Sequence, residues 1–322
     1  MRFARSLVAP YDLYLLFVIA LVTVVNRSRS LRLARFFARC AGLAAWWLSR
    51  RRRQSRERIL AQTLGISAAE TQRVVRRCFY EFWGNVFSLP QHENERSDGQ
   101  IAELRGLEHL DNALAKGRGV ILWESHSFGK RVLAKCVLHH NGFSVSQIHA
   151  KNHLEGFGNS ESWIAKNVIQ PFFEKREKPF VKEILYLTNE DISFNRTLLE
   201  RLKGNGILCI AADGRQGHKF IPVRFLGHSA LFSTGMISLA KHSVATILPL
   251  FCIQRATGKA TVIIEAPIPI EANGDRERGM EQSIKQYAGV LESYIRKYPE
   301  QYLIWQPLAL NDQTHENNKR NN

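Results

Sequence analysis

Residues 117–131 read Gly-Arg-Gly-Val-Ile-Leu-Trp-Glu-Ser-His-Ser-Phe-Gly-Lys-Arg. The apolar run Val120–Trp123 follows a glycine-rich turn, and a short run bounded in this way is typical of a strand buried in an α/β sheet. Sites in such sheets assemble at the carboxyl ends of strands, which is where His126 falls. A histidine there is well placed as a general base, although a strand-end histidine on its own is often structural.

Strand-like and helix-like segments alternate from residue 101 onward. This alternation predicts an α/β fold with a central, mostly parallel sheet flanked by helices. Strands are expected at 120–123, 143–148, 207–212, 245–253 and 260–265, and helices at 132–140, 197–202, 232–241 and 278–298. Upstream, Ser67-Ala-Ala-Glu70 reads as a capping box that opens another helix.

The chain is strongly basic, with a formal net charge of +16 over 322 residues and a pI near 9.9. Such a balance indicates an acidic partner, which can be an anionic membrane, an acidic protein or nucleic acid. The five cysteines are scattered and form no CxxC pair, so a disulfide framework or a zinc cluster is not expected. No metal or tightly bound cofactor is expected either.

Most of the excess charge lies near the N-terminus, because residues 1–58 hold thirteen arginines, no lysine and only two acidic residues. The apolar run at 13–25 is shorter than the roughly 20 residues that span a bilayer as a helix. A basic amphipathic pattern at 31–49 follows it, and then four arginines at 50–53. These features predict an interfacial membrane attachment. A core helix with a solvated arginine face is the alternative.

A cleaved signal peptide is less well supported, because a basic flank follows the apolar run directly and no small-residue cleavage site closes it. Nucleic acid is not an expected partner, because no known binding motif accompanies the arginines. We therefore expect a membrane-anchoring helical region over 1–100, an α/β domain over 101–310 and a disordered tail over 311–322.

A second candidate motif, Ala211-Ala-Asp-Gly-Arg-Gln-Gly217, follows another predicted strand. Parallel strands end at one edge of a sheet, so Asp213 and Arg215 are expected to line the same cleft as His126. A plain Asp-Gly turn would explain the motif equally well. The sequence contains no Gly-x-Ser-x-Gly, P-loop or dinucleotide fingerprint.

Together these pieces resemble the lauroyl and myristoyl acyltransferases of lipid A biosynthesis, in the lysophospholipid acyltransferase superfamily. The resemblance rests on the order and spacing of short motifs along most of the chain. They are Arg50–Arg53, Phe79-Tyr-Glu-Phe-Trp83, Gly117–Leu122 with His126, Leu202-Lys-Gly-Asn-Gly206 with Asp213, Phe225-Leu-Gly-His-Ser-Ala230, Tyr298-Pro-Glu-Gln-Tyr302 and Trp305.

One departure from that family is chemical. Its signature is a histidine followed, after four residues, by an acid that orients it, and here Arg131 occupies the acid's position. Glu124 is the nearest substitute in sequence, since its side chain would share the side of His126 in an extended segment. Asp213 is the nearest substitute by analogy with that family. A structural salt bridge from Glu124 to Lys130 or Arg131 is the alternative.

The resemblance implies an acyltransferase at the cytoplasmic face of the bacterial inner membrane. It would move a fatty acyl chain from acyl carrier protein or coenzyme A to a hydroxyl of a lipid or glycolipid. His126 and Glu124 are the expected catalytic residues. The residues expected to bind substrate are Lys130, Arg131, Asp213, Arg215 and His149, with Lys151 as an alternative to His149. A catalytically silent protein that binds lipid or scaffolds a pathway is the rival, because the acid is missing.

Overall fold

The structure is a computed structural model. It describes residues 10–28, 30–88, 102–150, 153–154, 158–159, 162–187, 192–211, 219–254, 259–270, 276–303 and 305. The expected tail at 311–322 lies outside these residues.

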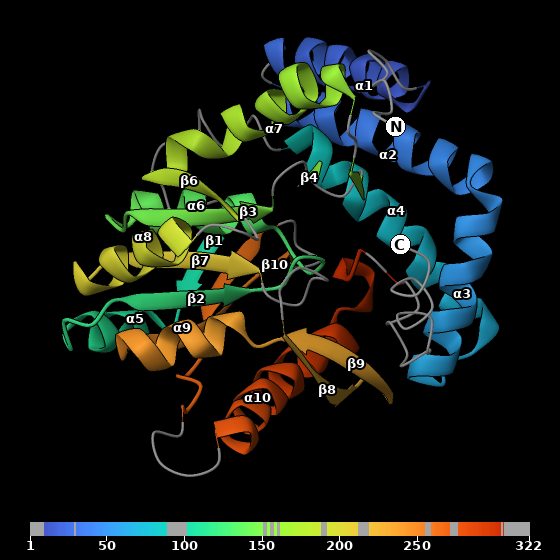
Figure 1. The fold of residues 1–322 in the computed structure, drawn as a ribbon. Coiled ribbons are helices and arrows are strands. Elements are labelled where there is room, and N and C mark those ends of the chain that lie inside the picture. Colours follow the sequence, from blue (N-terminus) through green and yellow to red (C-terminus); the bar gives the residue numbers. More distant parts are fainter. Residues whose placement is uncertain are drawn as a thin grey trace, which may run out of the picture.

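A seven-stranded sheet forms the centre of the molecule (Figure 1). Its strands are β1 (Ala102–Arg105), β2 (Val120–Glu124), β3 (Val145–Ala150), β6 (Glu183–Leu187), β7 (Ile207–Ala211), β10 (Thr246–Gln254) and β11 (Ala260–Ile264). They lie in the order β1-β11-β10-β2-β7-β3-β6. The five strands from β10 to β6 are mutually parallel, whereas β11 runs antiparallel to β10. The predicted mixed α/β fold with a mostly parallel sheet is confirmed.

Helices cover both faces of this sheet. The helices of the α/β part are α5 (Leu107–Leu114), α6 (Arg131–His140), α7 (Gln170–Glu177), α8 (Ile192–Lys203), α9 (Gly235–Ser243) and α10 (Arg276–Lys297). Apolar residues of α5 and α6 pack on one face, and those of α8, α9 and α10 pack on the other. Strand β2 is buried on both faces, as its unbroken apolar run predicts: Trp123 stacks on Tyr287 of α10, while Leu122 joins the α6 side.

The N-terminal region is a layer of four helices beside the sheet (Figure 1). They are α1 (Pro10–Arg27), α2 (Leu31–Leu48), α3 (Arg50–Leu64) and α4 (Ala68–Ser88). Helix α4 begins where the Ser67-Ala-Ala-Glu70 motif predicts, and Ser67 Oγ accepts the backbone N–H of Glu70 at 3.3 Å, which is one of the two hydrogen bonds of a capping box. Apolar residues of α1, α2 and α4 form one cluster with α7 and the π-helical turn Ala165–Ile169 before it. Among the described helices, none has the length and apolar content to cross a bilayer.

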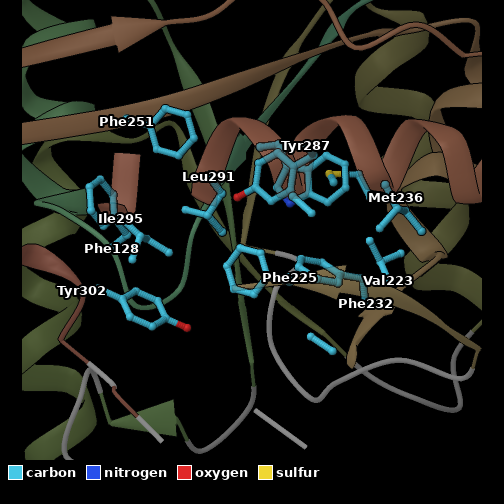
Figure 2. Packing of buried hydrophobic residues seen from close by; sticks show 14 of the residues in the cluster. Phe128, Val223, Phe225, Phe232, Met236, Phe251, Tyr287, Leu291, Ile295 and Tyr302 are labelled. Carbon is cyan, nitrogen blue, oxygen red and sulfur yellow. The ribbon is translucent and has the colours of Figure 1, made fainter. Parts of the chain in front are cut away.

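Sequence patterns missed the hairpin of β8 (Phe220–Phe225) and β9 (His228–Ser233), which packs against α10 (Figure 2). The helix expected at 232–241 begins instead at Gly235, because Phe232 and Ser233 belong to β9. The hairpin turns at Leu226 and Gly227, both with positive φ. A leucine in this conformation is uncommon, so Leu226-Gly227 is a weaker signal for a hairpin turn than Asn-Gly or Asp-Gly.

The two glycines of the turn before β2 should differ in how much their substitution by alanine destabilises the protein. Gly119 (φ 72°) has no room for a side chain, since a Cβ would lie 2.6 Å from the Leu202 carbonyl oxygen. Gly117 (φ 68°) faces open space. Gly117→Ala should lower the free energy of unfolding by about 1–2 kcal/mol, the cost of the left-handed conformation. Gly119→Ala should cost about 1–3 kcal/mol more because it also overpacks. Urea unfolding of both variants measures this, and equal losses would contradict the packing described for Gly119.

Candidate active site

His126 lies two residues beyond the end of β2 and is half-buried. Strand β2 is the central strand of the seven-stranded sheet, between β10 and β7. Its last residue, Glu124, is level with Ala211, the last residue of β7. The two strand ends that the sequence assigns to the candidate site are therefore adjacent, as expected for parallel neighbours. Asp213 and Arg215 follow β7 but lie outside the described residues, so their place in the cleft stays a prediction.

The loop that carries His126 is tied to its surroundings on both sides of Gly129. Phe128 is buried and packs edge-on against Phe251 of β10, with ring centroids 6.0 Å apart (Figure 2). Lys130 donates its backbone N–H to the Cys252 carbonyl at 3.0 Å. Gly129 has φ 76°, and a Cβ there would lie 2.4 Å from the same carbonyl oxygen. The close approach of loop and strand thus requires glycine at this position.

Glu124 is buried and is the centre of a charged hydrogen-bond network. Its Oε1 accepts from Arg131 Nε at 2.8 Å and from Arg131 Nη2 at 2.6 Å. Lys135 Nζ donates to both oxygens, at 3.0 and 2.8 Å, and Gln147 Nε2 donates to Oε1 at 3.2 Å. The salt bridge to Arg131 that the sequence left as an alternative is therefore present. The role of Glu124 as the acid that orients His126 stays a prediction.

The network continues from Lys135 to a second buried carboxylate. Lys135 Nζ lies 3.2 Å from Glu177 Oε1, at the end of α7. Glu177 Oε2 lies 2.7 Å from Nε2 of His149 in β3. Two buried carboxylates thus face Arg131, Lys135 and His149. Arg131 and Lys135 are one turn apart on α6, so both reach the same face of the sheet.

These contacts fix the charge states. Burial alone would raise the pKa of Glu124, but the charges and hydrogen bonds of Arg131 and Lys135 outweigh burial and lower it to about 2. Burial likewise opposes ionisation of Glu177, yet Lys135 and His149 lower the pKa of that carboxyl. Burial would lower the pKa of Lys135, and the two carboxylates raise it instead. Both carboxylates are therefore ionised, and Lys135 is charged, throughout the neutral range.

Lys130 belongs to a different environment from its neighbour Arg131. It is half-buried, and its charge interacts with those of Glu81 on α4 and Arg35 on α2. Burial lowers the pKa of Lys130, and Glu81 partly offsets this. Burial raises the pKa of Glu81, which Lys130 in turn opposes. The loop beside His126 therefore interacts electrostatically with the helical layer.

The structure joins three predicted site residues, Glu124, Arg131 and His149, in one network. Sequence reasoning missed Lys135, Glu177, Gln147 and Glu81. Only Lys135 carried a usable signal, since a lysine inside the apolar helical run Val132–Leu138 is expected to need a buried carboxylate. Lys151, the alternative to His149, lies outside the described residues.

An α/β sheet with a histidine beyond the end of its central strand fits the active site of a transferase or a hydrolase. Similarity to known proteins narrows the class of protein. The model of the bacterial lipid A biosynthesis acyltransferase family matches residues 1–310. The chain belongs to this family.

Curated relatives of the chain carry a related name. A phosphatidylinositol mannoside acyltransferase of Mycobacterium tuberculosis is 25% identical over 224 residues, which is 68% of this chain and 64% of the relative. The protein of that name from Mycolicibacterium smegmatis is 26% identical over 199 residues, or 61% of each chain. The similarity thus spans somewhat less than two thirds of these relatives.

The buried network predicts unequal effects for two lysines. Lys135→Met leaves Glu124 and Glu177 short of a counter-charge, and breaking a buried pair should lower the free energy of unfolding by about 3–5 kcal/mol. Lys285 pairs with Glu281 on the surface of α10, with its side chain 58% exposed. Lys285→Met should therefore cost less than about 1 kcal/mol. Urea unfolding at neutral pH tests both, and a loss below 1 kcal/mol for Lys135→Met would contradict the network.

Proposed function

We propose that the protein is a lipid acyltransferase in which His126 is the general base. His126 takes the proton of an acceptor hydroxyl, and the hydroxyl oxygen attacks the carbonyl carbon of an acyl thioester. An ester C–O bond forms, the thioester C–S bond breaks, and the proton passes from His126 to the leaving thiolate. The observation that carries this proposal is the position of His126. It is half-buried and lies on a loop that is held at the carboxyl end of β2, in a chain of this family.

The substitution of the family's acid by Arg131 bears on how His126 is oriented. A base of this kind needs a group that fixes its tautomer and stabilises its charged form. Arg131 cannot do so because it is cationic and its guanidinium is bound to Glu124. We propose that Glu124, the last residue of β2, orients His126 and stabilises its charged form. Asp213 is the alternative carboxylate.

The proposed substrates are a long-chain acyl thioester of acyl carrier protein or coenzyme A and a membrane lipid or glycolipid. The names of the mycobacterial relatives support a glycolipid acceptor. Lys130, Arg131, Asp213, Arg215 and His149 are proposed to contact the substrates. Among the described contacts, those of His149 with Glu177 and of Arg131 with Glu124 make Lys130 the better placed cation for a phosphate.

We further propose that α1 and α2 attach the protein to the cytoplasmic face of the inner membrane. Of the twelve large apolar side chains exposed on the described residues, nine belong to α1 and α2, and Val168 belongs to the turn Ala165–Ile169, which packs with these helices. Exposed arginines at 32, 35 and 39 accompany them on α2. Exposed apolar surface beside clustered cations suits an anionic lipid surface.

A catalytically silent protein that binds lipid is the rival function, and Arg131 favours it. The proposed chemistry predicts that His126→Ala lowers acyl transfer by at least about 10²-fold. Glu124→Gln should lower it by about 10- to 10⁴-fold, and the two effects should be strongly non-additive because the residues act as one unit. The assay uses a labelled long-chain acyl thioester and a bacterial lipid extract.

Thermal unfolding of each variant separates chemistry from stability, because Glu124 also belongs to the buried network. If activity changes with pH near neutrality, Glu124 is not the group that titrates, because its pKa is lowered to about 2. Full activity of His126→Ala would reject the assignment of the base. If Glu124→Gln is fully active and His126→Ala is inactive, Glu124 does not orient His126, and Asp213 becomes the proposed orienting residue.

If α1 and α2 attach the protein to the membrane, replacing their exposed aromatic side chains in the full chain should weaken its binding to lipid vesicles. Phe17 and Trp47 are 67% and 69% exposed, and Val244, next to α9, is 68% exposed. The double variant Phe17→Ser, Trp47→Ser should bind vesicles containing phosphatidylglycerol at least about tenfold more weakly, since each aromatic contributes more than about 1 kcal/mol when buried. Val244→Ser should bind as the intact protein does. Sedimentation with vesicles is the measurement, and equal binding by all three proteins would reject this surface.

A further inference from the structure

The C-terminal motif Tyr298-Pro-Glu-Gln-Tyr302 lies directly against the loop that carries His126. It follows α10 and forms a short 3-10 turn, Pro299–Gln301. Gly129 donates its backbone N–H to the Gln301 carbonyl at 3.2 Å, and Leu303 donates its own to the Ser127 carbonyl at 2.8 Å. With the antiparallel bridge between Phe128 and Tyr302, the loop and this segment form a short two-stranded ladder.

The side chain of Gln301 connects that ladder to the sheet. It is buried, and its Oε1 accepts the backbone N–H of Gln254 at 2.9 Å. Its Nε2 donates to the carbonyl of the same residue at 2.7 Å. Gln254 is the last residue of β10, the strand next to β2. The amide of Gln301 thus pairs with the end of β10 much as a residue of a neighbouring strand would.

We infer that Gln301 is a positioning residue for the proposed reaction: its side chain fixes the terminal segment against β10, and its backbone carbonyl then holds the loop next to His126. The inference rests on the proposed function, because it assigns Gln301 to the proposed base. Both hydrogen bonds of the Gln301 side chain are made with backbone groups of Gln254.

The segment is also held from the side opposite β10. Trp305 Nε1 donates to the Pro299 carbonyl at 3.1 Å, and Cys78 of α4 places its thiol 3.7 Å from the same oxygen. Phe128 and Tyr302 enter the same apolar cluster from the two strands of the ladder (Figure 2). Loss of the Gln301 amide should therefore free the side of this segment that faces β10, while the apolar contacts of Phe128 and Tyr302 remain.

The test compares Gln301→Met with Ser283→Ala in the full-length protein. Methionine keeps the length of the side chain and removes both hydrogen bonds. Ser283 is a matched control, since its buried hydroxyl also bonds backbone carbonyls, of Pro269 and Gly279. Pro269 follows Ile268, which bridges Ile247 near the opposite end of β10.

Gln301→Met should lower kcat about 10- to 100-fold, because a displacement of about 1 Å at a reacting group is enough for this, while KM stays within about threefold. Hydrogen exchange should accelerate at Gly129 and Leu303, without substrate present. Ser283→Ala should change neither quantity. Unchanged exchange at Gly129 would overturn the inference, as would faster exchange with kcat within twofold of the intact protein.

Gln301→Glu is the milder second variant. Its carboxylate keeps an acceptor for the Gln254 N–H but loses the donor, and protonation restores a donor. Its kcat relative to the intact protein at the same pH should therefore rise as the pH falls, and a constant ratio would count against the inference. If the intact protein transfers no acyl group, the proposed function fails. Exchange at Gly129 still decides in that case whether Gln301 holds the loop.

Discussion

The arrangement of the site depends on a carboxylate that is buried at the end of the central strand. Glu124 would be costly in this position without compensation, and Arg131 and Lys135 supply it from α6. Lys135 also reaches Glu177, which ties α7 and β3 to the same centre. The charge network therefore fixes α7 to the sheet, and α7 in turn packs through apolar residues against α1, α2 and α4, the helical layer that we propose binds the membrane. Such networks are weak evidence for stability but constrain which elements can pack together.

Arg131 does not contribute a carboxylate to the loop after β2, which is held in other ways. Arg131 joins Glu124 in the buried network, and the loop itself is fixed largely through backbone groups of Cys252, Gln301 and Leu303. Pre-organisation of a base requires only that its position be over-determined by its surroundings, and backbone hydrogen bonds can contribute as side chains do. The divergence from the family signature is thus compatible with an ordered site around His126.

The sheet was largely predictable from the sequence, and the buried network was not. Apolar runs such as Val120–Trp123 indicate buried strands directly, and the shared edge of β2 and β7 follows from their parallel direction. The β8–β9 hairpin escaped because its turn uses a left-handed Leu226. Arg131 was foreseen as a possible partner of Glu124. The rest of the network was missed because local spacing describes one element at a time, whereas Lys135, Gln147 and Glu177 meet only through the packing of α6, β3 and α7. The sequence placed Glu124 near His126 but could not choose between its two possible roles.

The central claim is that this chain transfers an acyl group to a membrane lipid and that His126 performs the chemistry. Mass spectrometry of whole-cell lipids tests it most directly, in cells of the source bacterium that lack the gene and carry either the intact gene or its His126→Ala form, expressed to equal levels. The account predicts that one lipid class gains the mass of one fatty acyl chain with the intact gene and not with the variant. The same lipid profile from the intact gene, the variant and the cells that lack both would contradict it.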